Sequence, residues 1–288
     1  KKTNFFTIHR SEKTNKISLS PNSICNYKFI CDCRNLEKLT EIIKKTNPDL
    51  IVHIVQSKYT KFVLKAIELS RIKKPKLIII GSLGLFSNYQ SVKEEYTEAE
   101  KLIDLYPNEI ILLRSGMIYG SEHDKNMHKL INFISKHNII PLPSGGSSLF
   151  QPVFYQDVSL SIFSIMHKYV SKGLFHSGTL NLSGPDTLSL KEICFVISKY
   201  FSKELFFINL PTENIYNILS FVESKGIKML PVNSEQILRL KEDKIFISNW
   251  ENNNFKISPT YFKDGIHSQI NSLFDPNSFL HSPIFRDF

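Results

Sequence analysis

Composition limits the class of protein before any motif is considered. The chain has 288 residues, of which 42% are hydrophobic and 22% are charged. This is ordinary globular composition, and it excludes collagen-like, coiled-coil and disordered proteins. No run of about 18 apolar residues occurs, so we expect no membrane-spanning helix. Four cysteines form neither a disulfide framework nor zinc knuckles, which predicts a reducing, cytoplasmic location and no metal site.

The net charge is +9, and a basic balance of this size is compatible with nucleic acid, an anionic membrane surface or acidic small molecules. The lysines and arginines are spread along the chain, however. The densest stretches, residues 71–74 (RIKK) and 241–244 (KEDK), are short or mixed in sign. We therefore predict a solvated lysine surface and no nucleic-acid or membrane partner. A basic pocket for a dinucleotide or a nucleotide sugar also fits this balance.

Strands and helices alternate through the first half of the chain. Short apolar runs predict strands at residues 5–8, 27–31, 50–55, 76–80 and 110–114, and apolar residues at helical spacing predict helices at 36–45, 61–69 and 94–105. Strands that are apolar throughout are covered on both faces, as in parallel sheets. Alternation at this pitch indicates βαβ units. We therefore predict an α/β fold built on a doubly wound parallel sheet.

The pattern changes near Asp124. We predict helices at 127–137, from Asp157 to about 172, and from Ser189, where Glu192 completes a capping-box pattern. Strands are expected at 150–154, 179–183 and 206–211, and a loop at 141–148. This division predicts a core at residues 1–123, a smaller C-terminal substrate-binding lobe at 124–274, and a loosely held tail at 275–288.

An ordered set of motifs carries a family resemblance. The motifs are residues 47–53 (NPDLIVH), 80–86 (IGSLGLF), 96–100 (YTEAE), 112–120 (LLRSGMIYG), 151–157 (QPVFYQD) and 181–185 (NLSGP). In this order they resemble the extended and atypical short-chain dehydrogenases/reductases, in the epimerase/dehydratase branch. The resemblance covers roughly residues 5–270 and implies a Rossmann-like fold, an NAD or NADP cofactor and a nucleotide-sugar or similar polar carbonyl substrate.

The glycine-rich turn of that family has no match here. Its G-x-x-G-x-x-G run lies between the first strand and the first helix and lets the pyrophosphate approach the backbone. No such run occurs, and residues 5–8 look like the family's second strand. We therefore expect that the first βα unit either lies outside this sequence or has been lost.

Five positions are predicted to contact the cofactor, because ligands of such sheets bind beyond the carboxyl ends of the strands. Arg10 follows the strand after which an arginine accommodates the 2′-phosphate of NADP, so NADP is favoured over NAD. Asp32 stands where the resemblance implies an adenine contact. The remaining candidates are Gln56, Ser82 and Gly116. A surface arginine and a plain turn aspartate are the alternatives at Arg10 and Asp32.

The catalytic residues are less completely matched. Ser82 matches the family's catalytic serine or threonine, whose hydroxyl binds the substrate oxygen; a serine that satisfies its own turn is the alternative. The family's Y-x-x-x-K pair falls on Val92 and Tyr96. Two other assignments stay open: Tyr89 with Lys93, which have the right spacing close behind Ser82, or Tyr96 as a replacement acid. A third possibility is that no such acid exists.

Four residues are predicted to bind substrate: Tyr119, Asn126, Gln151 and Arg239. A helix cap is equally possible at Asn126, and a solvated helix face at Arg239. We expect Asp157 to cap its helix, Arg114 to pair with a buried carboxylate, and His53 to be a hydrogen-bonded core histidine.

The resemblance implies two alternative functions. The first is an NAD(P)-dependent epimerase, dehydratase or reductase that binds a dinucleotide and a small-molecule substrate. The second is a catalytically inactive dinucleotide-binding regulator or structural subunit of a larger complex, which the imperfect Tyr/Lys pair favours. Helices at 61–69 and 94–105 would make a homodimer possible.

Overall fold

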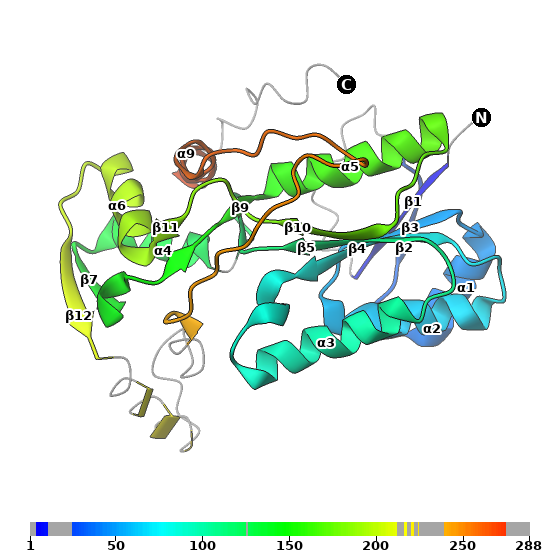
Figure 1. The fold of residues 1–288 in the computed structure, drawn as a ribbon, viewed down its shortest axis with the longest axis horizontal. Coiled ribbons are helices and arrows are strands. Elements are labelled where there is room, and N and C mark those ends of the chain that lie inside the picture. The colour runs from blue at the N-terminus through cyan, green and yellow to red at the C-terminus, as the bar shows by residue number, and fades with distance from the viewer. Residues whose placement is uncertain are drawn as a thin grey trace. The chain divides into compact units, whose positions relative to one another are not determined.

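The computed structural model describes residues 4–10, 25–124, 126–211, 216–217, 220–221, 224 and 239–274. The chain divides into two compact units (Figure 1). Unit 1 comprises Lys1–Phe86, Gln90–Arg114 and Ser164–Leu180, and unit 2 comprises Ser87–Tyr89, Ser115–Phe163 and Asn181–Phe288. The domain limits predicted at residues 123 and 274 stay predictions, and the predicted tail lies outside the described residues.

Two parallel ladders form the sheets of unit 1. Strand β1 (Phe5–His9) pairs in parallel with β2 (Cys25–Ile30). The larger sheet has the order β10 (Gly178–Leu182), β5 (Ile110–Ser115), β4 (Lys76–Ser82) and β3 (Leu50–His53). The central residues of β4, Leu77, Ile78 and Ile79, are at most 1% exposed, which is expected for a strand covered on both faces.

Helices cover both faces of the larger sheet. Helices α1 (Leu36–Thr46), α2 (Thr60–Ser70) and α3 (Gln90–Asp104) lie on one side of this sheet (Figure 1). Helix α5 (Tyr155–Lys172) begins in unit 2, and its unit 1 part, residues 164–172, lies on the other side. Two 3-10 turns, η2 (Ser57–Tyr59) and η3 (Leu83–Phe86), follow β3 and β4. The predicted doubly wound α/β fold is confirmed, and its core is formed by α1, α2 and the strands they cover.

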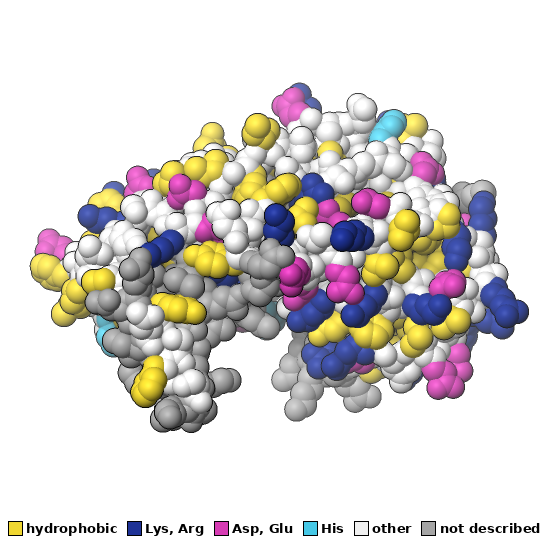
Figure 2. Space-filling model, turned by 60° about the horizontal axis from the view of Figure 1, so that its bottom comes forward, with side chains coloured by type: hydrophobic (Ala, Val, Ile, Leu, Met, Phe, Trp, Pro, Cys, Tyr) yellow, Lys and Arg dark blue, Asp and Glu magenta, His cyan; other side chains and the backbone are white. Residues whose placement is uncertain are grey.

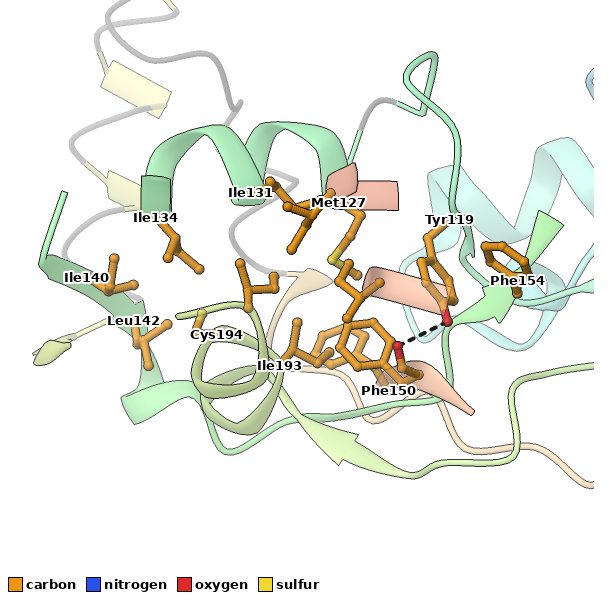
Figure 3. Close-up of a cluster of buried hydrophobic side chains, with 14 residues drawn as sticks. Tyr119, Met127, Ile131, Ile134, Ile140, Leu142, Phe150, Phe154, Ile193 and Cys194 are labelled. Carbon is orange, nitrogen blue, oxygen red and sulfur yellow. Dashed lines mark hydrogen bonds between the residues drawn. The ribbon is translucent and has the colours of Figure 1, made fainter. Parts of the chain in front are cut away.

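Unit 2 combines helices with short strand pairs. Its fully described helices include α4 (Met127–Lys136), α6 (Leu190–Tyr200) and α9 (Phe262–Phe274). The strand pairs are β6 (Ile118–Tyr119) with β9 (Val153–Phe154), β7 (Ile139–Pro143) with β12 (Phe206–Leu210), and β8 (Leu149–Phe150) with β11 (Leu188–Ser189). A 3-10 turn, η4 (Ser144–Gly146), follows β7. Apolar side chains from α4, α6 and β7 meet in one core (Figure 3).

Several predicted boundaries are wrong for local reasons. Helix α3 begins four residues before the predicted start at Glu94. The strand expected at 150–154 is split into β8 and β9, because Pro152 has no amide to donate to a ladder. Residues 141–143, predicted as loop, belong to β7. The capping box of Ser189 and Glu192 is confirmed.

Within the described residues, no helix has the length and apolar character needed to cross a bilayer.

Candidate functional site

Ser82 and Tyr96 lie on either side of Gly84 in unit 1. Ser82 ends β4 and its Oγ accepts a hydrogen bond from the Gly84 amide at 3.0 Å. A Cβ at Gly84 would lie 2.7 Å from Cε2 of Tyr96 and 3.1 Å from Oγ of Ser82. The Ser82 hydroxyl and the Tyr96 ring therefore lie on two sides of a small space next to Gly84, which the side chain of any other residue would fill. Ser82 satisfies its own turn as an acceptor, and its O–H proton is the part that a ligand oxygen can use.

A charged pair supports this part of unit 1. Arg114 of β5 donates from Nε to Oε1 of Glu100 on α3 at 2.8 Å, and Nη2 pairs with the second carboxylate oxygen. The two side chains are 20% and 15% exposed. The Phe86 ring centroid lies 5.4 Å from Cζ of Arg114, and a Cβ at Gly81 would lie 3.6 Å from Cγ of Arg114. The predicted pairing of Arg114 with a buried carboxylate is confirmed.

A second charged group lies at the ends of β1 and β2. Asp32 accepts from Arg34 at both oxygens, with Nε–Oδ1 at 3.0 Å and Nη2–Oδ2 at 2.7 Å. Arg10 lies beside it, with Nε 3.4 Å from Oδ2 of Asp32. The Arg34 hydrogen bonds hold the pKa of the Asp32 carboxyl well below its usual range. Two guanidinium groups against one carboxylate leave a net positive charge, and the Arg10 side chain is 75% exposed.

Apolar side chains are also exposed near the carboxyl end of β1 and directly after β3. Ile8 is 43% exposed, Ile54 is 68% exposed and Val55 is 43% exposed. Gln56, one of the predicted cofactor contacts, follows them and is exposed. Exposed aliphatic residues at the carboxyl ends of parallel strands are suited to a flat heterocycle.

His53, at the end of β3, is buried as predicted but makes no hydrogen bond through Nε2 within the described residues. Burial lowers the pKa of this imidazole to about 4, so His53 is neutral near pH 7. The prediction of a hydrogen-bonded histidine is therefore wrong for Nε2, and the imidazole is buried as an uncharged ring.

The alternative acid pair is divided between a turn and a helix. Tyr89 belongs to the turn before α3, and burial followed by the Glu242 charge raises the pKa of its phenol. Lys93 is exposed in the first turns of α3. The assignment of Tyr89 with Lys93 as an acid pair stays a prediction.

The predicted substrate residues of unit 2 have different surroundings. The Tyr119 side chain is fully buried, and its hydroxyl donates to the Phe262 carbonyl oxygen at 3.4 Å (Figure 3). Tyr119 therefore packs in the core, and the prediction that its side chain meets substrate is wrong. Asn126 precedes α4 but makes no side-chain cap. Asp124 does so instead, because its Oδ1 accepts from the amides of Asn126 and His128.

Gln151 and Arg239 are connected by one segment. Gln151 Oε1 accepts from the Phe246 amide at 2.6 Å, and its Nε2 donates to Thr187 Oγ1 at 3.2 Å. Lys244 Nζ donates to the Arg239 carbonyl oxygen at 2.7 Å. Gly116 also lies close to Gln151, because a Cβ on it would be 3.2 Å from the Gln151 carbonyl oxygen.

Asp157 does not cap a helix. It lies inside the first turn of α5, where its carboxylate accepts from the amide and hydroxyl of Thr260 at 2.8 and 2.9 Å. Burial raises the pKa of this carboxyl.

The sequence reasoning missed Glu242 and Lys244. Both stand in the mixed charge run at 241–244, which was predicted to be solvated, yet burial lowers the pKa of Lys244 to about 8. Its Nζ lies 4.7 Å from the Phe150 ring centroid. In the structure, every even-numbered residue from 240 to 248 is half-buried and every odd-numbered one is exposed, which is strand-like alternation. The residue types do not follow this alternation, because Ile245 and Ile247 occupy exposed positions, so no sequence signal marks Glu242 or Lys244.

Within the described residues, no group of three His, Cys, Asp or Glu side chains is arranged to hold a metal ion.

Comparisons with known proteins place the fold. No protein-family model matches the sequence. A curated relative is NADH dehydrogenase (ubiquinone) 1 alpha subcomplex subunit 9, mitochondrial, of Arabidopsis thaliana, which is 28% identical over 98 residues. That match spans 34% of this chain and 23% of the relative, so less than a quarter of the relative's length is represented.

Solved structures match over almost the whole chain. A dTDP-4-dehydrorhamnose reductase from Bacillus anthracis in complex with NADP has a TM-score of 0.65 and 15% identity, covering 93% of this chain and 98% of that one. The UDP-glucuronic acid 4-epimerase of Bacillus cereus, with UDP-glucuronic acid and NAD, has a TM-score of 0.62 and 14% identity, covering 92% and 89%. A Citrobacter triphenylmethane reductase complexed with NADP(H) has a TM-score of 0.63 and 13% identity, covering 92% and 90%.

Proposed function

Starting from the fold shared with these reductases and epimerases, we propose that the chain binds a nicotinamide dinucleotide and acts on a nucleotide sugar or a similar polar carbonyl compound. The observation that carries the proposal is the meeting of Ser82 and Tyr96 at Gly84, beyond the carboxyl end of β4. Ligands of open α/β sheets bind beyond this edge. The family resemblance implies a serine and a proton-donating acid at this place, and Ser82 and Tyr96 are the candidates for these two roles.

The residues present fit one end of the dinucleotide. Arg10 and Arg34 offer guanidinium groups to a 2′-phosphate, which supports NADP over NAD, and the exposed Ile54 and Val55 suit the adenine ring. The described residues hold no glycine-rich turn for the pyrophosphate. When bound, the dinucleotide would supply hydride transfer.

Two side chains would act on the substrate itself. The Gly84 amide occupies a lone pair of Ser82 Oγ, so the Ser82 hydroxyl donates its proton toward a substrate carbonyl oxygen and fixes its orientation. Tyr96 lies against the same point and serves as the proton donor. The Arg114–Glu100 pair stabilises the strand and helix that carry this site.

The test is a titration followed by turnover. NADPH binding is measured by fluorescence, and oxidation of the reduced nicotinamide is followed with dTDP-sugars and UDP-sugars. We expect Ser82→Ala and Tyr96→Phe each to lower turnover by about 100-fold, while the NADPH dissociation constant stays within about twofold. The proposal fails if neither dinucleotide binds, or if both variants keep wild-type turnover.

A second function is a dinucleotide-binding structural subunit. It is supported by the Arabidopsis relative, whose name makes it a subunit of a larger complex, and by the exposed position of Lys93. Binding of NADPH without turnover over the same panel of sugars would support this alternative.

The proposal includes a cytoplasmic location and a possible homodimer. Cys31, Cys33 and Cys194 are free thiols, which supports a reducing compartment. Figure 2 shows basic and apolar side chains interspersed over one face of the molecule. Among the exposed residues are Leu69 of α2 and Leu105 after α3. Sedimentation equilibrium would test whether Leu69→Glu lowers the mass from that of a dimer to that of a monomer.

A further inference from the structure

One carboxylate joins a turn to a segment that lies far from it in the sequence. Glu242 accepts from Ser87 Oγ at 2.9 Å through Oε2 and from the Asn88 amide through Oε1. Both oxygens are therefore used on a turn more than 150 residues away. Ser87 is 8% exposed, and its Oγ also accepts from the Tyr89 amide at 3.2 Å, so the carboxylate and the serine together hold three successive residues.

The residues that follow Glu242 fasten its segment to the rest of unit 2. Asp243 Oδ1 accepts from the Leu149 amide at 2.8 Å, and the Lys244 amide donates to the Leu149 carbonyl oxygen at 2.7 Å. Gln151 Oε1 takes the Phe246 amide. The segment from 242 to 246 therefore meets β8 at one isolated parallel bridge, between Lys244 and Phe150, with side-chain bonds on both sides of it.

This arrangement places one side chain between two groups of predicted site residues. On one side is the turn that carries Tyr89 and leads into α3. On the other are Gln151 and Arg239, the predicted substrate contacts, which the segment bonds through Phe246 and Lys244. A charged carboxylate with two donors makes strong, directional bonds, so movement of the segment must move the turn or break them.

We infer that Glu242 is a positioning residue that ties the Ser87–Tyr89 turn to the segment joining Gln151 and Arg239, so that a ligand bound on this segment sets the conformation of the turn. The identity of that ligand rests on the proposed function. The tie itself is a property of the free protein, and it is measured without any ligand, so its failure and the failure of the proposed function are separate results.

Two signals report the tie in the full chain. The first is the hydrogen-exchange rate of the Asn88 amide. The second is the pKa of Tyr89, followed by NMR with labelled tyrosine, since burial and, after it, the Glu242 charge raise this pKa. Glu242→Ala should speed Asn88 exchange by about tenfold. Glu242→Gln keeps an acceptor, so it should preserve the Asn88 protection while the Tyr89 pKa falls toward its ordinary value.

The neighbouring carboxylate provides the matched control. Asp243→Asn removes the same charge one residue away and retains an acceptor for Leu149, so neither signal should change. Gln151→Leu should speed Asn88 exchange in the wild-type background and add nothing to Glu242→Ala, because the coupling passes through the carboxylate. Unchanged Asn88 exchange in Glu242→Ala overturns the inference. The inference is also overturned if Asp243→Asn lowers the Tyr89 pKa as much as Glu242→Gln does. It is overturned as well if the effects of Gln151→Leu and Glu242→Ala on Asn88 exchange add in the double variant.

Discussion

The ion pair of Arg114 and Glu100 allows a quantitative test of how unit 1 supports its candidate site. The pair is bidentate, and its side chains are 20% and 15% exposed. Replacing Arg114 by Leu leaves the Glu100 carboxylate largely out of water and without its cation. Replacing Glu100 by Leu leaves the guanidinium in the same condition. Replacing both removes the two charges and leaves apolar volume between β5 and α3.

The expected magnitudes follow from this burial. Breaking a fully buried pair costs about 3–5 kcal/mol, and the residual exposure here reduces this to about 2–3 kcal/mol for each single variant. The double variant should lie within about 1 kcal/mol of wild type, because apolar residues of similar volume often replace a buried pair at little cost. The coupling energy is therefore about 3–6 kcal/mol. Each single variant should lower the melting temperature by roughly 6 °C.

Urea unfolding followed by far-UV circular dichroism measures these free energies. Lys65 and Glu68 provide a control pair at 2.9 Å, with side chains 52% and 62% exposed. Lys65→Met should change the free energy of unfolding by less than about 0.5 kcal/mol. If the two single effects at Arg114 and Glu100 simply add in the double variant, the reasoning from burial is refuted.

Three further changes test other parts of the chain. Burial lowers the pKa of Lys244 to about 8 in the folded protein, below its value in the unfolded chain, so below pH 8 the folded protein carries a buried charge that costs stability. Lys244→Met should therefore stabilise the protein by about 2 kcal/mol near neutral pH. This gain should shrink as the pH rises from the folded-state pKa to the unfolded-state pKa. A destabilised variant in urea near neutral pH would contradict this. Ser189→Ala removes a capping box and should cost about 1 kcal/mol in thermal unfolding; Ser189→Asp should restore most of it. Gly265→Ala places a methyl group against the buried Tyr119 hydroxyl and the Phe154 ring, and should cost about 2 kcal/mol or more. Ser268→Ala, at an exposed position of the same helix, should change the free energy of unfolding by less than about 0.5 kcal/mol; equal stability of the two variants would show that α9 can shift.

The elements of unit 1 were predictable because their pattern is local. Residues 50–52 and 77–80 are apolar throughout, and helices α1 and α2 have apolar residues at 3.6-residue spacing. Such signals lie within one window of sequence. The start of α3 was misplaced because the acidic residues taken to mark its first turn, Glu94 and Glu95, lie about one turn after the helix begins at Gln90. The assignment of Asp157 as a cap failed because a tertiary partner, Thr260, uses the same carboxylate oxygens that a cap would use.

The candidate site divides in the same way between local and long-range information. Ser82 and Arg114 could be placed from motifs, since each stands on a strand with a strong apolar pattern. Glu242 could not be placed in this way, because its partners, Ser87 and Asn88, lie more than 150 residues earlier in the sequence. Nothing in a run of four charged residues indicates which of them will bind a turn so far away in the chain. Charge alone favours solvent for such a run, and the half-buried positions of Glu242 and Lys244 are seen only in the structure. A carboxylate that satisfies two donors is more stable in this contact than in an unpaired, half-buried position, so the tertiary pairing overrides the local preference for water.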